Sequence, residues 1–170
     1  GTNTLRINGV GNFIGVAKAA NGREIQVNDP NPEPTYRTYT ILSLDADGRH
    51  MMIGIDIGHG HWTFRLDKLV GETFFHGNWK LKSESQALMV GTSQGAMDWW
   101  YIDTAGVSER SCYFDDMYTF QRDGSFKLSL GPQTWLVDWQ TSTPGCGTPI
   151  YPFDGTNTEM TWTYNPCLLS

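Results

Sequence analysis

The sequence has 170 residues, which is enough for one domain with a substantial hydrophobic core. Aromatic residues make up 13% and charged residues 18%, with 19 glycines and 8 prolines, a composition that excludes a disordered tail, a coiled coil and a collagen-like chain. The formal net charge of −6 disfavours nucleic acid and anionic membrane surfaces as partners. No apolar run approaches the roughly 20 residues of a membrane span. The composition predicts a soluble, aromatic-rich β domain.

Alternating apolar and polar residues predict β-strands along most of the chain. In chain order, they occur at residues 5–8, 35–44, 50–58, 61–68, 118–121, 125–130 and 160–164. Glycine-containing turns at residues 45–48, 58–60 and 122–124 separate several of them, as hairpins require. The single helix candidate is residues 84–90. We therefore predict an all-β, antiparallel fold of about eight to ten strands, as a barrel or a sandwich.

Two stretches, residues 91–110 and 135–154, are predicted not to be strands, and long loops often carry function. They contain five aromatic residues with acids and an amide beside them: Trp99, Trp100, Tyr101, Trp135, Trp139, Asp98, Asp138 and Gln140. The C–H face of a sugar stacks on an indole, and its hydroxyls bond carboxylates and amides. This set predicts a glycan-binding surface. The alternative is that the rings only pin the loops onto the barrel.

Three cysteines lie in polar, turn-like settings and none has zinc-type spacing. We predict a disulfide between Cys112 and Cys146, which would staple a loop rich in glycine and proline and imply an oxidising compartment. The alternative is two free, buried thiols. Cys167 is expected to be unpaired in a C-terminal tail.

The segment Gly-Asn-Trp-Lys-Leu at residues 77–81 and the hairpin pattern of residues 114–126 resemble lipocalin-like (calycin) modules of secreted bacterial proteins. Residues 90–100 and 133–136 extend the similarity. Such modules often accompany polysaccharide-degrading glycoside hydrolases. The resemblance implies a lipocalin-like β-barrel whose closed end holds Trp79 beneath a basic side chain, from Arg65 or Arg37, as well as a secreted or cell-surface location in a bacterium.

The two halves of the resemblance run in permuted order. Residues 1–68 resemble the C-terminal half of the module and 77–164 the N-terminal half, with 69–76 as linker and 165–170 as tail. Either residues 1–170 form one circularly permuted barrel domain, or two adjacent repeat halves are joined. A single closed barrel places the strand near Thr4 beside the strand near Tyr164. Otherwise two chains exchange halves, so we expect a monomer or a domain-swapped dimer.

Other chemistry-bearing residues give weaker patterns. His59 and His61, near Asp56, have the spacing of metal ligands, but no third ligand is forced. Neighbouring Asp115 and Asp116 point to opposite faces of a strand, so they cannot serve one bond. A calcium role for these acids, with Glu109, Asp123 and Asp154, is a further alternative.

No catalytic signature is visible in the sequence. We expect a non-catalytic glycan-binding accessory module with a polysaccharide or oligosaccharide partner and with no catalytic residue, metal or cofactor. The alternatives are a structural spacer repeat, a lipocalin-type binder of a small apolar ligand, and a glycoside hydrolase with an unrecognised acid pair.

Overall fold

The computed structural model describes residues 3–9, 11, 13–14, 19–20, 23–24, 36–68 and 76–165. The predicted linker (except residue 76), residues 166–170 of the predicted tail and Cys167 lie outside these residues. The elements are β1 (Thr4–Asn8), β2 (Ala19–Ala20), β3 (Arg23–Glu24), β4 (Tyr36–Leu44), β5 (His50–Asp56), β6 (His61–Lys68), β7 (Gly77–Leu81), β8 (Leu88–Gly91), β9 (Trp100–Tyr101), α1 (Thr104–Glu109), α2 (Ser111–Phe114), β10 (Met117–Phe120), β11 (Phe126–Ser129), β12 (Thr134–Leu136), β13 (Gly145–Gly147) and β14 (Thr161–Asn165).

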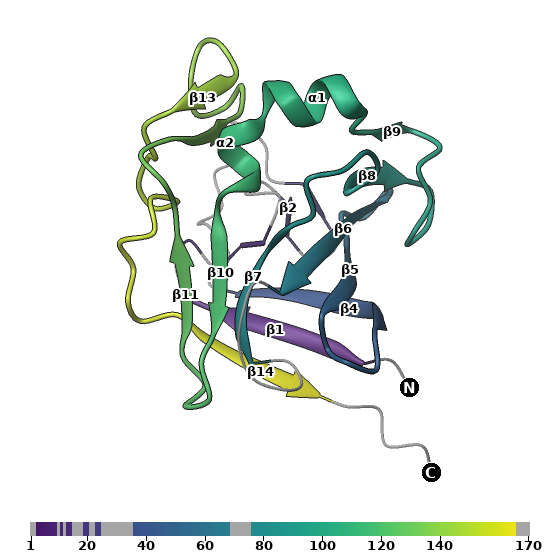
Figure 1. Ribbon diagram of the computed structural model, residues 1–170, viewed down its shortest axis with the longest axis vertical. Coiled ribbons are helices and arrows are strands. Elements are labelled where there is room, and N and C mark those ends of the chain that lie inside the picture. Colours follow the sequence, from purple (N-terminus) through teal and green to yellow (C-terminus); the bar gives the residue numbers. More distant parts are fainter. Residues whose placement is uncertain are drawn as a thin grey trace.

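The main sheet is an antiparallel, nearly closed barrel (Figure 1). Its strands follow the order β11-β10-β7-β6-β5-β4-β1-β14, and β8 and β9 extend it from β6. An isolated bridge between Ser125 and Thr161 brings the two outer strands together. There the amide of Phe126 donates to the carbonyl of Met160 at 2.8 Å. The predicted all-β, antiparallel barrel is confirmed.

The first and last described strands pair with each other. Strand β1 lies antiparallel to β14, with Leu5 opposite Tyr164, and β1 pairs on its other side with β4. The predicted proximity of these two segments is confirmed, and β1 and β14 lie side by side in Figure 1. Residues from both predicted halves, 1–68 and 77–164, therefore build one barrel within one chain.

Alternation along the strands fills the barrel with large side chains. Tyr39, Phe64, Trp79 and Tyr118 are fully buried. The hydroxyl of Tyr39 accepts from the amide of Ile14 at 2.7 Å and donates to its carbonyl at 3.1 Å, which satisfies the phenol inside the core. The bulk of these side chains argues against a barrel interior shaped for an apolar ligand.

Trp79 is buried, as the resemblance implies, and the structure places Lys68 over it. The ammonium of Lys68 lies 5.9 Å from the centroid of the Trp79 ring. Arg65, one of the two residues expected there, directs a guanidinium nitrogen to Glu84 at 3.6 Å. Because Lys68 and Arg65 lie three positions apart on β6, their side chains leave opposite faces of the strand.

The predicted helix at residues 84–90 is wrong. Residues 84–87 form a turn, and β8 follows with all four residues buried. Because β8 is buried on both faces, it lacks the alternation that identifies a half-exposed strand. The two short helices α1 and α2 were not predicted, although Asp103 caps α1 by accepting from the amide of Gly106 at 2.8 Å. The two stretches predicted not to be strands also contain β9 and the β12–β13 hairpin.

Candidate functional site

The two long segments meet at one end of the barrel, where α1, α2, β8, β9 and β13 gather at the top of Figure 1. The predicted disulfide between Cys112 and Cys146 is confirmed, with a Cα–Cα distance of 6.0 Å. It joins α2 to β13. Because Trp135 pairs with Cys146 across the β12–β13 hairpin, the disulfide also brings Trp135 towards the first segment.

Arg110, at the junction of α1 and α2, lies between two tryptophans. Its guanidinium carbon is 5.2 Å from the ring centroid of Trp100 and 4.5 Å from that of Trp135. Both distances are in the range of cation–π contacts. We call Trp100, Arg110 and Trp135 the cation sandwich. Sequence reasoning missed Arg110 because no motif links a single arginine to rings 10 and 25 positions away.

Strand β9 fixes the direction of Trp100. Trp100 pairs with Val90, which in turn pairs with Trp62, so the three side chains stand on one face of the sheet. The rings of Trp62 and Trp100 meet edge to face with centroids 6.1 Å apart. Tyr101, the next residue, therefore points to the opposite face, on the side of Thr63.

Trp99 is exposed to 46% and is nevertheless held in place. Its ring stacks on His59 with centroids 6.0 Å apart and an interplanar angle of 22°. It also covers Gly60, where an added Cβ would lie 2.5 Å from Cη2 of Trp99 and nearer still to Cζ3. The amide of Trp99 donates to the carbonyl of Val90 at 3.2 Å. We call Trp99, Trp100 and Tyr101, all exposed, the aromatic edge.

The loop of residues 92–98 is anchored to the barrel by side-chain hydrogen bonds. Asp98 accepts from the amide of Thr92 at 3.1 Å and from its hydroxyl at 2.9 Å, and these bonds lower the pKa of Asp98. Gln94 donates to the hydroxyl of Thr40 at 3.0 Å, and the amide of Gly95 donates to that of Thr63 at 3.0 Å. Asp98, a predicted ligand-binding residue, thus serves first to hold the loop that precedes the aromatic edge.

The remaining predicted residues lie in the segment that follows β12. Trp139 packs edge to face on buried Phe153, with centroids 5.4 Å apart. The carbonyl of the Gln140 side chain accepts from the amide of Val137 at 3.2 Å, and Asp138 is exposed beside them. Trp139 therefore packs as the structural alternative describes, pinning its loop to the core.

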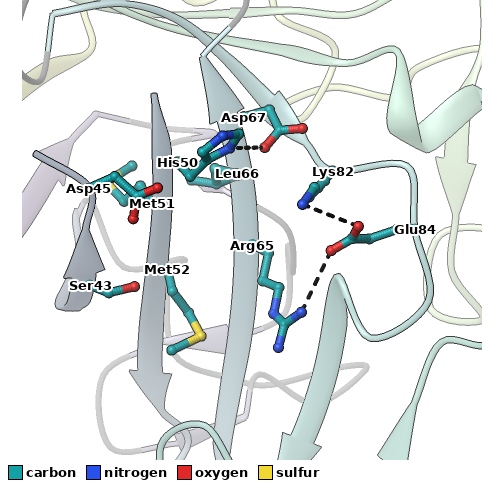
Figure 2. Close-up of a pocket in the computed structure, with 10 residues that line it drawn as sticks. All are labelled: Ser43, Asp45, His50, Met51, Met52, Arg65, Leu66, Asp67, Lys82 and Glu84. Atoms are coloured by element: carbon teal, nitrogen blue, oxygen red, sulfur yellow. Dashed lines mark hydrogen bonds and ion pairs between the residues drawn. The ribbon is translucent and has the colours of Figure 1, made fainter. Parts of the chain in front are cut away.

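A second candidate is an open pocket of about 240 Å³ on the outer face of β4, β5 and β6 (Figure 2). Most of its charged groups bind one another. Nδ1 of His50 lies 2.8 Å from a carboxylate oxygen of Asp67, and Glu84 contacts Lys82 at 3.1 Å and Arg65 at 3.6 Å. Asp67 and Glu84 are thus each engaged with a basic side chain, and Asp45 is the third acid of the lining.

The one carboxyl group in the described residues with a strongly raised pKa lies elsewhere. Burial raises the pKa of Asp116 to about 8, and its carboxylate accepts from the hydroxyl of Thr134 at 2.6 Å. Asp116 is buried whereas Asp115 is exposed, so the two acids do not face one site. Asp116 instead ties the start of β10 to β12.

The other weak candidates are dispersed over the surface. Asp123 accepts from the amide of Ser125 at 2.9 Å and Asp154 from that of Thr156 at 3.0 Å, so each closes its own turn. Within the described part of the chain, no group of three histidine, cysteine or acidic residues is placed to hold a metal ion.

Among the residues that the structure describes, no helix is long and apolar enough to cross a bilayer. The chain matches no protein-family model, no curated protein and no solved structure with which it was compared.

Proposed function

We propose that this protein is a non-catalytic carbohydrate-binding module that stacks sugar rings on the aromatic edge. The observation that carries the proposal is Trp99, an exposed indole with one side packed on Gly60 and His59. A ring held in this way loses little conformational freedom when a ligand covers its other side. Sugar rings present a flat, apolar C–H face that matches such a surface.

The surroundings of Trp99 also suit a polar ligand with an apolar face. Trp100 adds exposed ring surface next to it, and Tyr101 is exposed on the opposite face of β9. The half-buried guanidinium of Arg110, which contacts Trp100, offers hydrogen-bonding groups nearby. An exposed aromatic surface on an ordered loop is where binding residues are commonly found.

We further propose that the module is lipocalin-like and belongs to a secreted or surface protein of a bacterium. The sequence resemblance at residues 77–81 and 114–126 supports the first part. The disulfide between Cys112 and Cys146 supports an oxidising compartment. The main competitor is a spacer repeat without a ligand, in which the aromatic edge would serve only packing.

The test is binding to a panel of soluble polysaccharides, measured by affinity electrophoresis and by tryptophan fluorescence titration. We expect saturable binding with a Kd between micromolar and millimolar, which corresponds to about −4 to −8 kcal/mol. Trp99→Ala and Trp100→Ala should each weaken it about tenfold or more. The matched control is Tyr151→Ala, which removes an aromatic side chain exposed to 71% outside the aromatic edge and should leave the Kd unchanged.

Circular dichroism and thermal unfolding show whether each variant is folded. A folded Trp99→Ala protein that binds as tightly as the wild type would refute the proposed surface. The absence of binding to every polysaccharide of the panel would favour the spacer function.

A further inference from the structure

In the described part of the chain, the guanidinium of Arg110 contacts two tryptophan rings and no acid. In the part of the chain that the structure describes, no carboxylate lies within 4.0 Å of it, and its buried Nε has no hydrogen-bond acceptor. Arginine is otherwise buried or half-buried mainly in pairs with acids. A half-buried guanidinium without a counter-ion is therefore a candidate binding group for an anion from outside the chain.

Three acids near Arg110 along the chain are Asp103, Glu109 and Asp116. Asp103 caps α1 through the amide of Gly106. Asp116 is buried and bonded to Thr134. Glu109, the residue before Arg110, is exposed and, among the described residues, forms no ion pair with the guanidinium. None of these three acids therefore neutralises the charge of Arg110.

On the basis of the proposed function, we infer that the carbohydrate is acidic and that Arg110 binds its oxyanion. Each indole lies within cation–π distance of the guanidinium carbon, and Nε is buried, so an anion would bond to the two terminal nitrogens of Arg110. A carboxylate or a sulfate ester accepts two such bonds side by side, and these charge-assisted bonds are stronger than those to a neutral hydroxyl. Trp100 belongs both to the cation sandwich and to the aromatic edge, which connects Arg110 to the stacking surface.

The net charge of the chain means that an acidic polysaccharide would be attracted only close to Arg110. Because the chain carries a net charge of −6, polyanions are repelled at long range. An acidic polysaccharide that binds must gain its affinity at a particular cation. The salt dependence should accordingly be that of one or two ion pairs, far weaker than the dependence of a basic protein that binds polyanions over a wide surface.

The experiment compares acidic polysaccharides with matched neutral ones. Polygalacturonate is paired with its fully methyl-esterified form, and a sulfated galactan with the same galactan after desulfation. We expect the wild type to bind at least one acidic member about tenfold or more tightly than its neutral match. The two pairs identify whether the oxyanion is a carboxylate or a sulfate.

Arg110→Gln should weaken binding of the acidic member about 10- to 100-fold, as expected for hydrogen bonds to a charged group, and leave the neutral one within about twofold. Lys127→Gln, which removes one charge from an exposed position on β11, is the matched control and should change neither Kd. Arg110→Lys keeps the charge and should retain part of the preference, so it tests the inference if Arg110→Gln does not fold.

The outcomes separate the two proposals. If the wild type binds neutral polysaccharides as well as or better than acidic ones, the inference fails and the carbohydrate-binding function stands. An acidic preference that survives in folded Arg110→Gln also refutes the role of Arg110. If neither kind binds, the proposed function itself fails.

Discussion

Gly60→Ala would move the ring of Trp99 without removing it. A Cβ at position 60 would lie 2.5 Å from Cη2 of Trp99, whereas ordinary contacts begin near 3.4 Å. The ring must therefore shift by about 1 Å or more. Gly60 does not have a positive φ, so the alanine adds no backbone strain. The substitution tests whether the position of Trp99, and not only its presence, determines binding.

The expected loss follows from the exposed area of the ring. A tryptophan presents about 250 Å² at most, and the exposed 46% of Trp99 is about 115 Å². At about 25 cal/mol per Å², complete covering of this area gives about 3 kcal/mol, and covering half of it about 1.4 kcal/mol. Displacing the ring should therefore weaken binding about tenfold, because 1.4 kcal/mol corresponds to a tenfold change in Kd.

The variant should also have a cost to folding, of about the same size as the cost to binding. The variant disturbs the stacking of Trp99 on His59, which is worth about 0.5–1.5 kcal/mol. The assay is affinity electrophoresis with the polysaccharide that the wild type binds, together with urea unfolding. Loss of stacking should also change the emission of Trp99.

Gly145→Ala is the matched control. An added Cβ there meets no atom within 4 Å, and Gly145 does not have a positive φ. Its Kd and its free energy of unfolding should equal those of the wild type. Unchanged affinity in Gly60→Ala, with a displaced Trp99 shown by its emission, would refute stacking on this ring.

Three further predictions concern stability. The pKa of Asp116 is raised from 3.8 to about 8, so the folded state holds a proton that the unfolded chain loses, and the free energy of unfolding should fall as the pH rises from about 4 to about 8. Urea unfolding of Asp116→Asn should lack this pH dependence. An identical pH profile in the wild type and the variant would contradict the prediction. Reducing the disulfide between Cys112 and Cys146, 34 positions apart, should lower the free energy of unfolding by about 4 kcal/mol. The measurement compares urea unfolding of the reduced and the oxidised protein, and equal midpoints would contradict the loop-closure argument. Trp79→Ala should cost about 3–5 kcal/mol in the same assay, and a loss below about 1 kcal/mol would show that Trp79 is not a core residue.

The strands could be predicted where one face is buried and the other is exposed to solvent. The predicted strand at 61–68 coincides with β6, and that at 50–58 contains β5. Strand β8 could not be predicted because burial of both its faces removes the alternation. Helix α1 has no buried residue, so no periodic pattern marked it.

The candidate site could be predicted only in part. Exposure of Trp99, Trp100 and Tyr101 agrees with the glycan-binding hypothesis, but that hypothesis grouped Trp139 with them. The structure shows Trp139 on Phe153 instead, a tertiary contact that no local pattern encodes. Arg110 was missed for the same reason, since its contact with Trp135 depends on the disulfide and the β12–β13 hairpin.

The pairing of β1 with β14 determines how the barrel would respond to mechanical load. Thr4 lies opposite Asn165, so a force that pulls these two ends apart acts along the hydrogen bonds of the antiparallel pair. The bonds then break one pair at a time, as in a zipper, instead of resisting together in shear. Opening would begin at Thr4 and Asn165, while the pairing of β6, β8 and β9 under the aromatic edge carries no load at that stage. A chain tethered at these two positions would yield there at low force and keep its aromatic edge intact.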